Sequence, residues 1–284
     1  MRLNPFNTGN IRVRSSGGGG GGIGKGGVGC GALVIALLGA VFFGLDPVNT
    51  LSTMQGGQQG APTSEDQLTE QEACSQGPYA REMCNALGSL NQTWAPVFQQ
   101  AGVPFQDPVL DLYRGNGVNT GCGSAPAAAG PFYCPADQGI YINTGFFDQL
   151  AQMSGDSGDF ARYYVIAHEY GHHIQALTGI ADQIRSAQSQ NRGRANQLQV
   201  LMELQADCYA GVWAGKNRNL IEPGDIEEGM RAASAIGDDV LMQRSGQRVN
   251  PESFTHGSSA QRQQALRLGL QGDDTQCDAI TNVG

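Results

Sequence analysis

Two histidines four positions apart are the most chemically suggestive feature of this sequence. They begin and end the run HEYGH at 168–172, inside the segment 159–178, whose pattern predicts one helix. Residues four apart share a helix face, so His168 and His172 would project to one point, as two ligands of a zinc ion must. Glu169 lies about 100° around the helix, where its carboxylate could act as a base on metal-activated water without being a ligand.

A third ligand is needed to distinguish a zinc site from a chance match, because HExxH also arises by chance and a helix face with histidines could be an ordinary solvent-exposed surface. No histidine follows at the HExxHxxGxxH spacing, but Glu203 and Asp207 lie four residues apart in 197–216, another predicted helix. Glu203 could complete a His2Glu site, and Asp207 could fix a ligand imidazole's tautomer by accepting a hydrogen bond from its far nitrogen. The segment is strongly apolar, so carboxylates there need a partner, which argues against an ordinary solvated acidic face.

The runs HEYGHH, ELQADCYAG and FTHGSSAQRQQAL together resemble the neutral zinc metallopeptidases, single-span bacterial membrane proteins among the gluzincins. The resemblance covers most of 73–284, including GPFYCPADQGIYI. It implies a mainly helical α+β, zincin-like metallopeptidase domain with a short sheet. It also implies one Zn²⁺ per chain, held by His168, His172 and Glu203, and a peptide or protein substrate.

The resemblance assigns further roles near this zinc site. Glu169 would take a proton from the attacking water and return it to the leaving amine. His256 would hydrogen-bond the oxyanion of the tetrahedral intermediate, or else is a surface or capping histidine ahead of a helix that starts near residue 258. His173 points about 100° away from His172, so we expect it either to support a ligand residue from behind or to be structural.

A substrate-binding strand is expected just upstream of the histidine helix. In gluzincin-like folds an edge strand at this place hydrogen-bonds an extended peptide, and the resemblance gives that role to the apolar residues Ile140, Tyr141 and Ile142. A plain core strand is the alternative. No GxMEN-type element is present to bind a free amino terminus, which favours endopeptidase over aminopeptidase activity.

The elements that must position these residues are predicted to be mostly helical. Apolar residues at spacings of three and four indicate a helix over 80–99, interrupted near Pro96. Further helices are expected at 225–242 and 258–270, and the Pro-, Gly- and Asn-rich stretch 105–145 favours a few short strands. Gly171 lacks a side chain and would let another element pack closely against the histidine helix.

Six of the seven cysteines follow residue 46 and form an even set, which indicates disulfides in an oxidising compartment. Six cysteines permit 15 pairings. Short loops favour two of the pairs and leave the third: Cys74 with Cys84, Cys122 with Cys134, and Cys208 with Cys277.

The segment 28–45 is uncharged over 18 residues, and as a helix of about 27 Å it would nearly span a bilayer core. We interpret it as an uncleaved signal anchor. A cleaved signal peptide is less suitable, because bulky Phe42, Phe43 and Leu45 stand where small residues are needed.

Charge sets the expected topology. The four basic residues before position 46 all precede the predicted span, and no acidic residue does, so the positive-inside rule places the N-terminus in the cytoplasm and the catalytic domain outside, in the periplasm or on the cell surface. The predicted organisation is a cytoplasmic Gly-rich tail, a transmembrane anchor, a polar linker and a metallopeptidase domain: 1–27, 28–45, 46–72 and 73–284.

The acidic body argues against nucleic acid as a partner. After residue 45 there are 13 basic and 26 acidic residues, a net charge of −13. Two other classes of protein remain alternatives: a zinc-stabilised pseudopeptidase that binds an envelope protein without cutting it, and a disulfide-stapled binding module with a chance HExxH.

Overall fold

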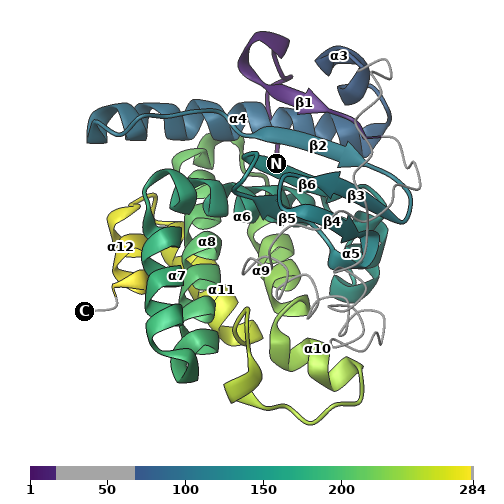
Figure 1. The fold of residues 1–284 in the computed structure, drawn as a ribbon. Coiled ribbons are helices and arrows are strands. Elements are labelled where there is room, and N and C mark those ends of the chain that lie inside the picture. Colours follow the sequence, from purple (N-terminus) through teal and green to yellow (C-terminus); the bar gives the residue numbers. More distant parts are fainter. Residues whose placement is uncertain (17–67, 283–284) are drawn as a thin grey trace.

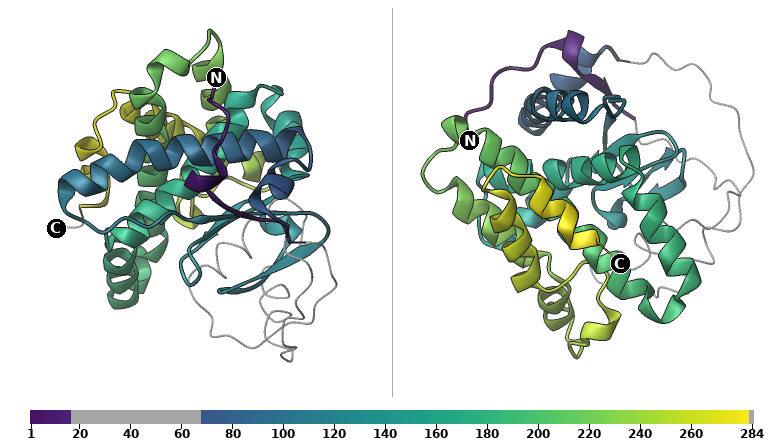
Figure 2. Two further views of the ribbon diagram at one scale, coloured as in Figure 1. Left: turned by 90° about the horizontal axis from the view of Figure 1, so that it is seen from above. Right: turned by 90° about the vertical axis from the view of Figure 1, so that its left-hand side faces the viewer.

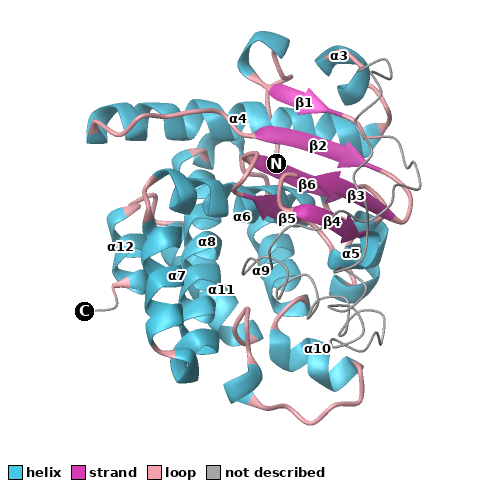
Figure 3. Cartoon of the chain, viewed as in Figure 1, coloured by secondary structure: helices cyan, strands magenta, loops and turns pink. Residues whose placement is uncertain are grey.

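The computed structural model describes residues 1–16 and 68–282. The strands gather in one half of the molecule and most helices in the other (Figure 3). The predicted class, mainly helical α+β with a small sheet, is confirmed. Within the described ranges, no helix combines the length and the apolar character needed to cross a bilayer. The predicted anchor 28–45 lies outside these ranges, as does nearly all of the predicted linker.

One mixed sheet and one hairpin make up the β structure (Figure 1). The sheet runs in the order β1-β2-β6-β5, with β5 antiparallel to β6 and the other pairs parallel. Strands β3 and β4 form the antiparallel hairpin. The bounds are β1 (Arg12–Arg14), β2 (Val109–Tyr113), β3 (Gly117–Thr120), β4 (Gly123–Pro126), β5 (Phe132–Cys134) and β6 (Gly139–Asn143). The strands predicted within 105–145 are therefore confirmed.

The proposed substrate-binding strand is an interior strand. Ile140, Tyr141 and Ile142 lie in β6, fully buried, and β6 pairs with β2 on one side and with β5 on the other. Ile140 and Tyr141 are paired on both sides and so have no free backbone groups to offer an added strand, and Ile142 is paired with β2. The edge-strand role predicted for these residues is therefore wrong, and the core-strand alternative is correct; β5 is the outer strand on that side of the described sheet.

Residues 1–16 belong to the folded unit, which corrects the prediction of a separate N-terminal tail. The segment lies across α4, and β1 pairs with β2 (Figure 2). The Arg14 guanidinium donates to the fully buried Asp111 carboxylate at 2.6 Å, and Asn91 donates to the Asn10 carbonyl at 2.9 Å. A single membrane crossing at 28–45 would separate β1 from β2, so the cytoplasmic position predicted for 1–27 conflicts with this pairing for residues 1–16.

Ten α-helices are described, and α6, which carries the HEYGH run, packs against α4, α8, α9 and the sheet. The predicted helices over 80–99, 159–178, 197–216 and 258–270 are confirmed within a few residues. The bounds are α3 (Glu70–Cys74), α4 (Pro78–Ala101), α5 (Phe146–Ser154), α6 (Asp159–Leu177), α7 (Ile180–Gln190), α8 (Ala195–Lys216), α9 (Asp225–Ala235), α10 (Asp238–Arg244), α11 (Ser259–Gly269) and α12 (Thr275–Asp278).

Two predicted helices differ from the structure. Helix α4 continues through Pro96, because Trp94 and Phe98 on either side are buried in the core and hold the helix despite the missing N–H. The predicted helix 225–242 is divided into α9 and α10. At the break, a Cβ on Gly237 would lie 2.3 Å from the backbone nitrogen of Ser259, so the chain turns where it meets the start of α11.

All three predicted disulfides are confirmed. Cys74–Cys84 joins α3 to α4, Cys122–Cys134 joins the hairpin turn to β5, and Cys208–Cys277 joins α8 to α12. The last pair closes a loop of 69 residues, so it ties the C-terminal segment directly to the helix that carries Glu203 and Asp207.

Candidate metal centre

The site is built where α6 and α8 approach each other closely. A Cβ on Gly171 would lie 2.8 Å from the Cα of Ala206, a separation that no side chain allows. The prediction that Gly171 permits close packing is thus confirmed. Because the helices meet there, the His168 face of α6 opposes the Glu203 face of α8.

The three predicted ligand residues converge. The distance from His168 Nε2 to Glu203 Oε2 is 3.1 Å and that from His172 Nε2 to the same oxygen is 3.4 Å. Ligand atoms about 2.0–2.1 Å from a tetrahedral zinc ion lie roughly 3.3 Å apart. The two nitrogens and the carboxylate oxygen therefore fit one zinc ion, and two neutral imidazoles with one carboxylate are donors that zinc accepts.

Asp207 lies behind His168, as predicted. Its Oδ1 is 2.7 Å from His168 Nδ1 and accepts a hydrogen bond from the Tyr164 hydroxyl at 2.6 Å. Accepting from Nδ1–H leaves the Nε2 lone pair of His168 directed at the ligand cluster. Burial lowers the pKa of His168, but the Asp207 carboxylate outweighs it and raises the pKa to about 10 in the metal-free chain.

Arg262 is the residue that sequence reasoning missed on this side of the site. Its guanidinium donates to both oxygens of Asp207, at 2.8 and 2.9 Å, and to the Tyr164 hydroxyl at 3.0 Å. Burial raises the pKa of Asp207, yet Arg262 and His168 together lower it to about 2, so the carboxylate stays ionised. A signal was present: Arg262 precedes Ala265 and Leu266 by three and four residues, on the buried face of α11.

Neutral amides support the other two ligands. Gln175 Oε1 lies 2.8 Å from His172 Nδ1 and accepts its hydrogen, which directs His172 Nε2 at the cluster. Gln199 Nε2 donates to Glu203 Oε1 at 2.8 Å and leaves Oε2 facing the histidines. Each amide lies on the same helix as the ligand that it contacts, three or four residues away, and that spacing was the available signal.

Glu169 is buried beside the ligands but lies outside their cluster. Across the described residues its carboxylate makes no hydrogen bond. Burial raises its pKa, and the neighbouring His168 and His172 only partly oppose that effect. The carboxylate is thus poised to accept a proton, as the sequence predicts for a general base.

His256 is also buried, with Asp238 as its partner. The Asp238 carboxylate lies 3.1 Å from its Nδ1 and accepts the backbone N–H groups of residues 255–257. A Cβ on Gly257 would lie 3.3 Å from a side-chain atom of Leu204, the residue after Glu203, so the turn that carries His256 packs against α8 beside that ligand. The capping role belongs to Ser258, which excludes the surface-histidine alternative.

His173 points to the sheet. Its Nε2 donates to the Gln106 carbonyl at 2.7 Å, and the Tyr133 hydroxyl of β5 donates to its Nδ1 at 3.0 Å. Burial lowers the pKa of His173 to about 4 and keeps the ring neutral. The expected structural role agrees with these contacts.

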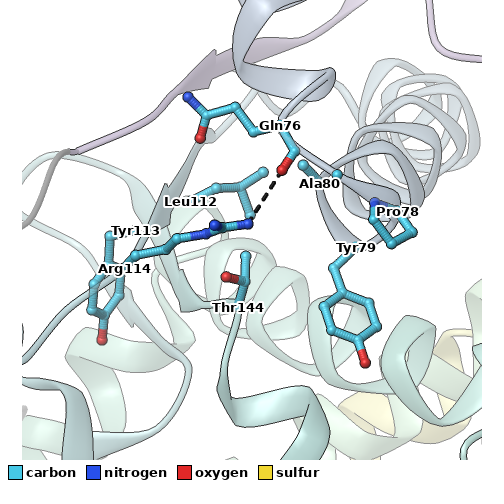
Figure 4. Close-up of a pocket in the computed structure, with 9 residues that line it drawn as sticks. Gln76, Pro78, Tyr79, Ala80, Leu112, Tyr113, Arg114 and Thr144 are labelled. Carbon is cyan, nitrogen blue, oxygen red and sulfur yellow. Dashed lines mark hydrogen bonds between the residues drawn. The ribbon is translucent and has the colours of Figure 1, made fainter.

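A small hollow lies elsewhere, between the start of α4 and the end of β2 (Figure 4). Arg114 donates there to the Gln76 carbonyl, and Thr144 and Tyr79 line the opposite side. None of its residues comes from α6 or α8, so it is not part of the metal centre.

Comparisons with known proteins agree with this geometry. A family model described as "Putative neutral zinc metallopeptidase" matches residues 5–280. The "Uncharacterized protein YpfJ" of Escherichia coli K12 is 42% identical over 252 residues, which are 87% of this chain and 85% of that protein. The "Uncharacterized protein Rv2575" of Mycobacterium tuberculosis H37Rv is 42% identical over 207 residues, 68% of each chain. No solved structure matches the chain significantly.

Proposed function

The chain belongs to this neutral zinc metallopeptidase family, and on that premise we propose that it is a zinc-dependent endopeptidase of the gluzincin type with a zincin-like domain. One observation carries the proposal. Three ligand atoms converge from two helices, and beside them Glu169 presents a buried carboxylate with no hydrogen-bond partner among the described residues.

Each site residue has a distinct task in the proposed reaction. His168, His172 and Glu203 would hold zinc, which when bound lowers the pKa of water and polarises the scissile carbonyl. Glu169 accepts a proton from the attacking water and donates it to the leaving amine nitrogen. Because Glu169 is not a ligand, its loss removes the base and leaves the zinc site intact.

His256 stabilises the charge that develops on the carbonyl oxygen. The Asp238 carboxylate lies 3.1 Å from Nδ1 and fixes the ring, which leaves Nε2 as the ring atom that would contact the carbonyl oxygen. Burial raises the pKa of Asp238, but hydrogen bonds from His256 and the turn around it lower it overall, so the carboxylate is ionised.

An extended substrate would add to the outer strand β5. Its outer side has no partner strand in the described sheet, and Tyr133 ties it to α6 through His173. Main-chain pairing at such an edge requires no free substrate terminus, which suits an endopeptidase.

The domain is proposed to act outside the cytoplasm, in the periplasm or at the cell surface. Three disulfides favour an oxidising compartment. Attachment to a membrane through residues 28–45 remains a prediction, but a single crossing there would put residues 1–16 on the opposite side from the zinc site and would be incompatible with the pairing of β1 with β2.

A comparison of wild type with Glu169→Gln and Glu203→Gln tests the proposal. Wild type and Glu169→Gln should each bind one zinc, whereas Glu203→Gln should lose most of it, because a neutral amide oxygen replaces an anionic ligand. Peptide fragments with new N-termini should form in envelopes of cells that carry wild type and be missing with Glu169→Gln. Zinc binding without any difference in fragments would instead support the pseudopeptidase, and wild type without zinc would support the binding module.

A further inference from the structure

Two fully buried glutamines link His172 to the C-terminal segment of the chain. Gln175 accepts from His172 Nδ1 and donates from Nε2 to the Gln205 Oε1 at 2.9 Å. Gln205 donates in turn from Nε2 to the Thr281 hydroxyl at 2.9 Å and to the Cys277 carbonyl at 3.2 Å. Gln205 belongs to the ELQAD run, between Glu203 and Asp207, and the proposed reaction gives it no task.

The Cys277 carbonyl determines which group donates and which accepts in each of these hydrogen bonds. A backbone carbonyl can only accept, so the Cys277 carbonyl holds the Gln205 amide nitrogen toward it and the Gln205 oxygen toward Gln175. Gln175 must then present Nε2 to Gln205 and Oε1 to His172. The Met202 carbonyl, which accepts the second Gln175 hydrogen at 2.7 Å, fixes the same orientation.

That orientation decides which imidazole nitrogen can bind a metal. If the Gln175 amide were reversed, its N–H group would face His172 Nδ1, and Nδ1 would have to be the unprotonated nitrogen. The hydrogen would then lie on Nε2, the atom that points at Glu203. The amide pair therefore selects the tautomer that the ligand cluster needs.

The C-terminal segment is fastened to the helix that carries Gln205. Cys277, whose carbonyl is one of the two acceptors, is disulfide-bonded to Cys208, three residues after Gln205 on α8. The Tyr209 hydroxyl donates to Asp278 at 2.6 Å, a second tie between the same segments. The acceptors thus have a fixed position relative to α8, and Figure 1 shows α12 beside α8.

We infer that Gln205 is a positioning residue for the ligand His172, and that the C-terminal turn at 277–281, held by the Cys208–Cys277 disulfide, supports the metal centre. The inference rests on the proposed zinc site. It adds to that site residues that contact neither the metal nor the substrate and act through His172.

Zinc affinity, measured by titration with a competing chelator, tests the inference directly. Gln205→Met should weaken zinc binding by about 10-fold, at the lower end of the effect of removing an outer hydrogen-bond partner. Thr281→Val should weaken it by a smaller factor, and Thr281→Ser, which keeps the hydroxyl, should bind as wild type does. Co²⁺ bound in place of zinc should show an altered visible spectrum in Gln205→Met, because that spectrum reports ligand geometry.

Two matched disulfide variants separate support of the metal centre from general stability. Replacing Cys208 and Cys277 by Ala should lower zinc affinity, whereas replacing Cys74 and Cys84, which lie in α3 and α4, should leave it unchanged in protein that circular dichroism shows to be folded. Equal zinc affinity and equal Co²⁺ spectra for wild type and Gln205→Met would overturn the inference alone. A wild type that binds no zinc would overturn the proposed zinc site as well.

Discussion

Helix α6 places buried histidines on two faces, and the surroundings of those faces have opposite effects. His168 faces α8 and α11, where burial lowers its pKa but Asp207 raises it to about 10 in the metal-free chain. His173, five residues later, faces the sheet, where burial lowers its pKa to about 4 and its partners are a tyrosine hydroxyl and a carbonyl. Burial alone therefore makes a histidine neutral and inert.

The difference locates the chemistry. A divalent cation needs negative charge to compensate it, and of the two histidine faces only the one toward α8 has carboxylates beside the imidazoles in the described part of the chain, from Glu203 and Asp207. On the sheet face, no carboxylate lies within hydrogen-bond distance of His173 among the described residues. Variants on the α8 face should thus change zinc binding, and variants on the sheet face should change stability alone.

Arg262→Met should have the largest effect. It removes the guanidinium that pairs with both oxygens of the fully buried Asp207, and breaking one partner of a buried ion pair costs about 3–5 kcal/mol. Urea unfolding of the metal-free protein measures this loss. Arg267→Met, an exposed position on the same helix, is the control, and its free energy of unfolding should stay close to that of wild type. Equal stability of the two variants would contradict the buried ion pair between Arg262 and Asp207.

His173→Gln should change how stability depends on pH. The folded-state pKa of His173, about 4, lies below the usual value of 6.5. Between these two pH values the unfolded chain binds a proton at this histidine and the folded chain does not. The stability contribution is complete above pH 6.5 and is lost as pH falls toward 4, by up to about 3 kcal/mol.

Glutamine cannot titrate and can still donate to the Gln106 carbonyl, so it isolates this effect. The free energy of unfolding of metal-free wild type should therefore decline more steeply than that of His173→Gln between pH 6.5 and 4. Parallel curves would show that the sheet face does not hold a neutral histidine.

Asp207→Asn should weaken zinc binding by about 10- to 100-fold, because Asp207 acts on the metal through the His168 imidazole. The loss should be smaller than for Glu203→Gln and larger than for Glu169→Gln, which removes no ligand. Chelator competition on the three variants gives the order. Zinc held as tightly by Glu203→Gln as by wild type would leave only the histidine pair as ligands.

Local spacing explains what the sequence could predict. His168 and His172 share a face because of helix geometry, and Glu203 and Asp207 were found because carboxylates in an apolar segment need partners. Short sequence separation likewise predicted the pairing of Cys74 with Cys84. Once the short-loop pairs were assigned, Cys208 was left to pair with the distant Cys277.

Contacts between distant segments explain what was missed. β1 has only three residues, of which Val13 alone is buried, so no alternating pattern marks it. β6 is an interior strand because β2 and β5, which precede it in the chain, pair with it on opposite sides. The break at Gly237 depends on a collision with Ser259, and Asp238 reaches His256 only because of that break. None of these relations has a signal within one helix or strand.

The smallest expected effect comes from a matched pair of tyrosines that bond the two sides of the site: Tyr133 of β5 contacts His173 on the sheet face of α6, and Tyr164 of α6 contacts Asp207 of α8. Tyr133→Phe removes the hydroxyl that donates to His173 and should cost about 1 kcal/mol of stability, with zinc affinity unchanged. Tyr164→Phe removes a hydroxyl that donates to Asp207 and accepts from Arg262, so it should weaken zinc binding as well. Urea unfolding and chelator competition on both variants make the comparison, and a loss of zinc affinity in Tyr133→Phe equal to that in Tyr164→Phe would mean that the two faces are not separate.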